Sequence, residues 1–433
     1  MEPTRVRRLA REGTWILLGQ VASVAGALVL VRVLTGRLDP TEYGHLAIGL
    51  TVAGLVNQVV MGGVSAAVAR FYSIAAEAQD LPAYLRSSRR LMAWATAAVG
   101  LIGLALIPCL LALGQRQWVG LAAAALALSI ASGYNAALGG IQNAARQRAV
   151  VALHSGLDAW LKILLVVLVL AWLGRSAAAV VVGYLLTTLL VTGSQLWFLG
   201  RLARGQVAAP VEDAGWFEQM GAFARPFLIW GAFSWAQQSS DRWALERFDG
   251  AREVGLYAVL FQLGYTPIAM ATGLAMAFLG PIFYQRAGDA TDPARNANVH
   301  RLVRQIASSC LLLTGVGALL AAALHGWLFR LLVAAEYRAV SHLLPWMVVA
   351  GGLFSAGQLL ALKLMSDLKA ATMTWAKIVT AALGVALNIG GAWAAGLRGS
   401  VAALVAFSAI YFLWMVLLVL RAPPAATPQP TPA

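Results

Sequence analysis

Long apolar runs separated by short polar segments dominate this chain of 433 residues. Charged residues make up only 12% of it, whereas a soluble domain carries roughly 25%. A helix needs about 20 apolar residues to cross a bilayer. Twelve runs of that order can be counted: 14–35, 45–68, 91–113, 118–140, 150–173, 177–200, 223–241, 254–284, 302–324, 343–365, 372–395 and 399–420. The sequence therefore predicts an all-α polytopic membrane protein with about twelve transmembrane helices.

A motif from the first half of the chain recurs in the second half. Arg32, Arg37, Asp39, Glu42 and Gly44 are matched by Arg242, Arg247, Asp249, Glu253 and Gly255, at an offset of 210 or 211 positions. This offset, about half the chain, indicates duplication of a half-protein. Six runs per half give both halves the same orientation, so we expect two six-helix lobes related by a pseudo-two-fold axis along the membrane normal.

These observations divide the chain into four segments. We expect an N-terminal lobe over residues 1–200 and a C-terminal lobe over 223–421, joined by a cytoplasmic amphipathic linker at 201–222. The Pro/Ala/Thr-rich segment 422–433 has nothing to bury and is predicted to be a disordered tail. Within the C-terminal lobe, the overlong run 254–284 holds Pro267 and Pro281 and is predicted to kink.

The basic residues predict the orientation of the chain. With the N-terminus in the cytoplasm, 21 Lys and Arg residues fall inside, 9 fall outside, and Arg32 and Lys162 lie within spans. This bias predicts that both termini are cytoplasmic. The net charge of +14 is scattered in short clusters between spans, which is typical of membrane topology and not of a nucleic-acid-binding surface. No nucleic acid is expected as a partner.

Nothing in the sequence resembles an enzyme site. It lacks a glycine-rich phosphate loop, a Cys/His metal spacing and a nucleophile with a nearby base, and its loops are too short for an ATP-binding domain. We therefore expect a protein that is not an enzyme and has no cofactor or metal. Any uphill transport would then draw on H⁺ or Na⁺ coupling, or on the gradient of the substrate itself.

The fifth run carries three ionisable residues spaced four apart. His154, Asp158 and Lys162 lie on one helical face, and Lys162 is about 18 Å from the cytoplasmic end, near the bilayer midplane. A charge at that depth is costly, so it should face water or a partner. In one interpretation Lys162 binds an anionic substrate, and His154 and Asp158 are proton or ion sites. In the alternative, Asp158 and Lys162 form an internal pair that neutralises itself.

Polar residues of the first, second and seventh runs are further candidates. The matched helices of a repeat are natural cavity walls, which makes substrate-binding candidates of Gln20, Arg32, Asn57, Arg70, Arg225 and Gln237, and an ion-coupling candidate of Asp241. Arg70 and Arg225 lie at cytoplasmic ends, where snorkelling to the headgroups is an equal explanation. Arg32 and Arg242 could instead pair with Asp39 and Asp249 to shape the outer turns. Asn388 in the eleventh run is a further candidate.

Several short motifs resemble a known family. They are Leu18-Gly19-Gln20, the turn Leu38-Asp39-Pro40-Thr41-Glu42-Tyr43-Gly44, Ala69-Arg70-Phe71-Tyr72, Ser240-Asp241-Arg242, Glu253-Val254-Gly255-Leu256-Tyr257 and Ala335-Glu336-Tyr337-Arg338. In order and spacing these resemble bacterial polysaccharide-biosynthesis membrane proteins, the Wzx-type flippases of the multidrug/oligosaccharidyl-lipid/polysaccharide exporter superfamily.

The resemblance implies two six-helix lobes around a cationic cavity in the bacterial inner membrane. It further implies that the protein flips undecaprenyl-diphosphate-linked oligosaccharide by alternating access, coupled to proton or sodium flow. The expected partners are then this lipid-linked oligosaccharide and membrane lipid, with a polysaccharide polymerase or glycosyltransferases as further candidates. Two alternatives remain open: an exporter of drugs or small cations from the same superfamily, and a non-transporting scaffold of a glycan-assembly complex.

Overall fold

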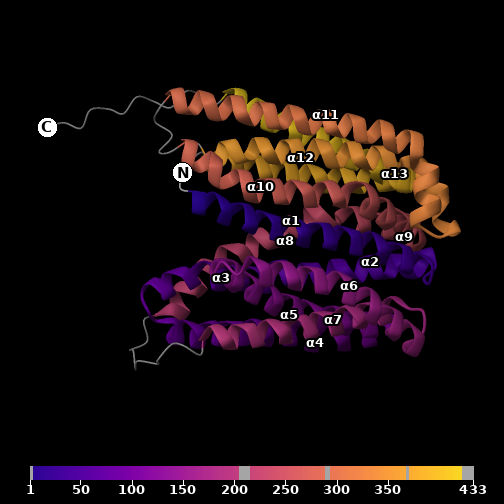
Figure 1. Cartoon of the computed structure of the whole chain (residues 1–433). Coiled ribbons are helices and arrows are strands. Elements are labelled where there is room, and N and C mark those ends of the chain that lie inside the picture. The colour runs from indigo at the N-terminus through magenta and orange to yellow at the C-terminus, as the bar shows by residue number, and fades with distance from the viewer. Residues whose placement is uncertain (1–2, 204–214, 288–292, 367–369, 422–433) are drawn as a thin grey trace. The chain divides into compact units, whose positions relative to one another are not determined.

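The computed structural model describes residues 3–203, 215–287, 293–366 and 370–421. The predicted tail 422–433 and residues 204–214 of the predicted linker lie outside these ranges. Helices are the only regular secondary structure in the described ranges, as Figure 1 shows. Their bounds are α1 Pro3–Thr35, α2 Pro40–Val56, η1 Asn57–Met61, α3 Gly62–Glu77, α4 Leu81–Ala112, α5 Arg116–Ala144, α6 Arg148–Leu173, α7 Ala177–Ala203, α8 Trp216–Asp249, α9 Ala251–Leu260, η2 Phe261–Tyr265, α10 Thr266–Ala287, α11 Pro293–Leu332, η3 Ala335–Leu343, α12 Leu344–Ser366 and α13 Ala370–Arg421.

Ten helical segments of the described chain are long and apolar enough to cross a membrane. The two remaining predicted runs are also helical. Residues 223–241 lie within α8, whose polar residues from Gln237 to Asp241 lower its hydropathy. The runs 372–395 and 399–420 both lie in α13, where non-helical backbone angles at Ala395 and Gly396 separate two helices. The predicted all-helical, polytopic fold is confirmed.

The chain divides into two compact units, Met1–Trp235 and Ala236–Ala433. The boundary falls inside α8 and not in the predicted linker, because the first part of α8 packs in the N-terminal unit. The indole Nε1 of Trp216 donates to Asp80 Oδ2 at 2.7 Å, and both side chains are buried. Further along α8, a Cβ on Gly63 of α3 would lie 2.8 Å from the carbonyl oxygen of Ala224, so these two helices approach closely.

Glycines also hold α1 against α6 in the N-terminal unit. A Cβ on Gly19 would lie 3.0 Å from the Cα of Ala152, and one on Gly26 would lie 2.8 Å from the Cβ of Ala159. Small residues that let helix backbones approach are a common device for packing membrane helices, because lipid offers no hydrophobic driving force between them. This contact places α6, which carries His154, Asp158 and Lys162, beside α1 on one side and α7 on the other.

The second long helix of each half contains a π-turn. The first is η1 between α2 and α3, and the second is η2 between α9 and α10. The second π-turn ends at Tyr265, two residues before Pro267, in the helix that its prolines predict to kink. A proline removes a backbone donor, and a π-turn is one local adjustment that accommodates this.

The two copies of the repeated motif lie at equivalent turns but make different contacts. Asp39 caps α2, and its Oδ1 accepts from the backbone N–H of Glu42 at 2.9 Å. Asp249 ends α8, and its carboxylate lies directly against Gly396, where φ is +54°. The suggested pairs between Arg32 and Asp39 and between Arg242 and Asp249 are wrong. Arg242 pairs with its neighbour Asp241, while Arg32 is exposed and forms no ion pair within the described residues.

Candidate functional site

The deep ionisable residues of α6 form an ion pair. Lys162 Nζ donates to Asp158 Oδ2 at 2.8 Å, and the two side chains are 23% and 29% exposed. The Lys162 ammonium also lies 5.2 Å from the centre of the Tyr184 ring on α7. The spacing of four residues places both side chains on one face of α6, which is why they meet. The pair carries little net charge, as the alternative interpretation of the sequence predicted.

His154 belongs to a separate contact between α6 and α7. Its Nδ1 donates to the carbonyl oxygen of Val150 at 2.8 Å, and its Nε2 lies 3.0 Å from the hydroxyl of Ser194. Its ring packs edge-on against Phe198 with 5.5 Å between centres. At 2% exposure, both ring nitrogens are satisfied locally. Within the described part of the chain, no hydrogen bond or ion pair joins His154 to Asp158, although the sequence places them on one helical face.

The remaining candidates of the N-terminal unit differ in exposure. Asn57 Nδ2 donates to the carbonyl oxygen of Ser129 at 3.3 Å, so this amide ties η1 to α5. Gln20 is half-buried on α1. Arg70 on α3 and Arg225 on α8 are exposed, and neither forms an ion pair within the part of the chain that the structure describes. Arg70 and Arg225, with the exposed Arg32, are therefore cations available to bind a ligand.

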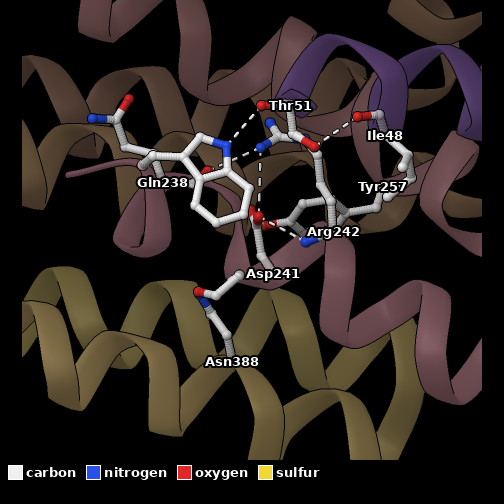
Figure 2. A network of polar contacts seen from close by, with 9 residues as sticks. Ile48, Thr51, Gln238, Asp241, Arg242, Tyr257 and Asn388 are labelled. Carbon is white, nitrogen blue, oxygen red and sulfur yellow. Dashed lines mark hydrogen bonds and ion pairs between the residues drawn. The ribbon is translucent and has the colours of Figure 1, made fainter. Parts of the chain in front are cut away.

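The C-terminal unit holds a buried acid in α8. Asp241 is 2% exposed, and its Oδ2 accepts from the hydroxyl of Tyr257 on α9 at 2.8 Å. Its Oδ1 lies 3.4 Å from Arg242 Nη1, which also donates to the carbonyl oxygen of Gln238 at 3.0 Å. Figure 2 shows this network, in which Tyr257 and Arg242 both reach the carboxylate. The backbone N–H of Arg242 also donates to Oδ1 at 2.7 Å, so this buried carboxylate is satisfied by a hydroxyl, a backbone amide and a cation.

Aromatic and amide side chains extend this network. The Arg242 guanidinium lies 4.6 Å from the centre of the Phe261 ring, which stacks on Tyr265 with 4.5 Å between centres. Asn388 Nδ2 of α13 donates to Ser240 Oγ, next to Asp241 in α8, at 2.9 Å. Gln237 is half-buried one helical turn before Asp241. The polar residues of α8 are therefore held by both α9 and α13.

The sequence did not single out several residues that complete these sites. Tyr184, Ser194 and Tyr257 each contact one of the predicted ionisable residues. Tyr257 is the one with a usable signal, because it ends the motif Glu253-Val254-Gly255-Leu256-Tyr257. Tyr184 and Ser194 sit in an ordinary apolar run, and only the packing of α6 on α7 brings them to the charges.

Comparison with known proteins decides the family. The profile of the family described as "Polysaccharide biosynthesis protein" matches residues 9–286, which is more than half of the chain. The chain belongs to this polysaccharide biosynthesis protein family. The comparison with curated proteins found no significant match. Membership agrees with the resemblance drawn from the turn and helix motifs, and the matched range contains every predicted site residue except Asn388.

Solved structures share the fold at low sequence identity. The lipid II flippase MurJ in an inward closed conformation has a TM-score of 0.67 at 11% identity, over 95% of this chain and 87% of that one. An inward-facing multidrug resistance MATE transporter of the MOP superfamily has a TM-score of 0.61 at 14% identity, over 92% and 94%. A variant of the Vibrio cholerae MATE transporter VcmN has a TM-score of 0.61 at 16% identity, over 96% of each chain. These folds are those of flippases and transporters and not of enzymes, and the family member described here is a multi-pass membrane protein of the same fold.

The hydrogen bond between Tyr257 and Asp241 should contribute measurably to stability. A hydrogen bond to a charged group contributes about 1.5–3 kcal/mol, so Tyr257→Phe should lower the free energy of unfolding in detergent by that order. Tyr411→Phe is a matched control, because Tyr411 is equally buried but its hydroxyl has no partner among the described residues. We expect the control to be neutral or slightly stabilising. Equal losses in the two variants would contradict the assigned role of Tyr257.

Proposed function

We propose that this protein flips undecaprenyl-diphosphate-linked oligosaccharide from the inner to the outer leaflet of the bacterial inner membrane by alternating access. The observation that carries the proposal is the family match over residues 9–286. The fold shared with the lipid II flippase MurJ over 95% of the chain supports it. A polysaccharide polymerase or glycosyltransferases would be its candidate partners.

The exposed arginines supply the chemistry that the substrate requires. A diphosphate carries negative charge and several acceptor oxygens, and guanidinium groups bind such oxygens in pairs. Arg70, Arg225 and Arg32 have exposed side chains without acidic partners in the described residues. Gln20 and Asn57 of the same unit would add hydrogen bonds to the diphosphate or to the sugars.

The ion pairs of α6 and α8 would serve coupling. Asp158 with Lys162, and Asp241 with Arg242, place one acid and one base inside each unit. A proton or a sodium ion that binds the acid would release its basic partner, so that ion binding and the charge offered to substrate would be linked. Lys162 would bind the diphosphate in this released state. His154, one helical turn before Asp158, would contribute to coupling by holding α6 against α7 through Ser194.

The alternative of a drug or small-cation exporter finds less support in the geometry. Such a protein would offer unpaired acids to a cationic substrate. Asp158 and Asp241 are both paired with bases, whereas Arg70 and Arg225 are not paired with acids. A non-transporting scaffold would leave the ion pairs inside the membrane without a purpose.

Purified protein in liposomes tests the proposed activity directly. A fluorescent, diphosphate-linked oligosaccharide lipid placed in one leaflet should reach the other much faster than in protein-free liposomes, as detected by an impermeant quencher. Arg70→Ala and Arg225→Ala should each slow this movement about tenfold, since about 1.4 kcal/mol of lost binding corresponds to that factor. Arg86→Ala, an exposed arginine of α4 outside the proposed site, is the control and should act as wild type. Movement no faster than in protein-free liposomes would overturn the proposal.

The ion pair of α6 calls for a double-variant test. Lys162→Ala should slow flipping by about tenfold or more, because it removes a charge-assisted contact of about 1.5–3 kcal/mol. The variant Asp158→Asn/Lys162→Gln removes both charges and keeps hydrogen-bonding groups of similar size. If Lys162 binds substrate, this double variant stays slow. If Lys162 only neutralises Asp158, the double variant recovers wild-type flipping, and Arg70 and Arg225 remain as the anchors.

The proposed orientation, with both termini in the cytoplasm, can be tested in intact cells. We expect an impermeant thiol reagent to label Gln115→Cys, between α4 and α5, and to leave Ala78→Cys, between α3 and α4, unmodified. Both positions are exposed, and the native Cys109 and Cys310 are first replaced by alanine. Labelling of Ala78→Cys alone would reverse the orientation, and with it the assignment of Arg70 and Arg225 to the cytoplasmic end.

A further inference from the structure

Buried amide and hydroxyl groups without partners gather between α5 and α7. Gln142 of α5 is 2% exposed, and Gln195 and Thr192 of α7 are 3% and 7% exposed. Both side-chain polar atoms of Gln142, the Oε1 of Gln195 and the Oγ1 of Thr192 have no hydrogen-bond partner among the described residues. These atoms belong to none of the sites described above.

Contacts between the two helices bring these groups to one part of the α5–α7 interface, called the seam below. Gln195 Nε2 donates to Asn135 Oδ1 of α5 at 3.0 Å, and it lies 3.8 Å from where a Cβ of Gly139 would be. Gln142 is seven residues after Asn135 and three after Gly139, so it shares their helical face. Helical side chains point back toward the N-terminus, which directs the Gln142 amide toward the level of Gly139 and Gln195. Gly139 has no side chain to fill the space between the two amides.

The chemistry of the unpartnered atoms selects one ligand. A buried amide or hydroxyl without a hydrogen bond has lost its contacts with water and gained none in return, so four such atoms between two packed helices would destabilise the pair. They include two donors, Gln142 Nε2 and the Thr192 hydroxyl, together with the acceptor oxygens of Gln142, Gln195 and Thr192. A metal ion would satisfy the oxygens only, and an anion would satisfy the donors only. Water both donates and accepts, and buried waters typically make about three hydrogen bonds to such groups.

The polar face of α7 continues from this seam to the ion pair of α6. Tyr184, Thr188, Thr192 and Gln195 follow one another at intervals of four, four and three residues, and so lie on one helical face. Tyr184 lies at the other end, with its ring 5.2 Å from Lys162 Nζ. Hydroxyls and amides therefore form a stripe from Gln142, near the end of α5, to the pair of Asp158 and Lys162.

We infer that the seam between α5 and α7 holds ordered water, and that this hydrated seam carries protons between the cytoplasmic end of α5 and the ion pair of Asp158 and Lys162. Gln142, Gln195 and Thr192 hold the water. The proton-carrying role rests on the coupling function proposed above for Asp158. The presence of the water does not rest on that function, so the water and the proton route can be tested separately.

Thermal unfolding of purified variants tests the water. In a hydrated seam, Gln142→Leu and Thr192→Val each lower the melting temperature, by about 2 °C or more, because each removes a partner of the water. The double variant falls by less than the sum, since the second change removes a contact already lost. In a dry seam the same changes delete unsatisfied polar atoms and raise the melting temperature, which would overturn the inference.

Thr187→Val is the matched control for Thr192→Val. Thr187 is also buried in α7, but its hydroxyl donates to the carbonyl oxygen of Gly183 at 2.9 Å. Its effect should add to that of Gln142→Leu without coupling. If Thr187→Val and Gln142→Leu were as non-additive in melting temperature as Thr192→Val and Gln142→Leu, the non-additivity would be a general response of the helix pair. That result would contradict a shared water.

Proton-driven flipping tests the route. In liposomes with a pH gradient, Thr192→Val and Gln142→Leu should lose most of the acceleration that the gradient gives wild type, and Thr187→Val should keep it. The melting temperatures of Thr192→Val and Gln142→Leu could be non-additive while the pH gradient still accelerates flipping as in wild type. That result would support the ordered water and overturn the proton route. Wild-type flipping that ignores the gradient would overturn both the proposed proton coupling and the route, while the thermal test of the water would still stand.

Discussion

The exclusion of unpaired charge from the membrane interior governs this structure. Two ion pairs are each formed by neighbours on one helix, Asp158 with Lys162 in α6 and Asp241 with Arg242 in α8. Each pair is completed by a tyrosine from an adjacent helix, Tyr184 or Tyr257. A charge that has lost its water must find an opposite charge or a hydrogen bond nearby. The pairs can therefore persist within the long helices of a membrane protein.

This arrangement separates two kinds of cation. Lys162 and Arg242 are committed to acids inside their own units, whereas Arg70, Arg225 and Arg32 are exposed and unpaired within the described residues. The exposed set suits a diphosphate that must bind and leave again. The paired set suits an ion-binding switch, because its charge becomes available only when the acid is neutralised. Under the proposed function, this division would let one chain combine recognition of an anionic lipid with ion coupling.

The fold was largely predictable because the thickness of the bilayer sets the length of each apolar run in the sequence. All twelve apolar runs correspond to helical segments. Length and hydropathy alone identify only ten of these segments, because α8 is too polar at Gln237 to Asp241 and α13 merges two helices across Gly396. The site was only partly predictable. Spacing by four placed Asp158 against Lys162, but the partners Ser194, Tyr184 and Tyr257 depend on which helices pack together. The two copies of the turn motif could not be distinguished by sequence either, since Asp39 caps a helix and Asp249 packs on Gly396.

The most direct test of the account is whether the protein recognises the charge of its lipid. Binding of undecaprenyl diphosphate and of uncharged undecaprenol to the purified protein can be compared by native mass spectrometry at rising ionic strength. We expect the diphosphate lipid to bind much more tightly, and its advantage to shrink as salt screens the exposed arginines. Equal binding of the two lipids at every ionic strength would contradict the proposal that exposed cations anchor a lipid-linked diphosphate.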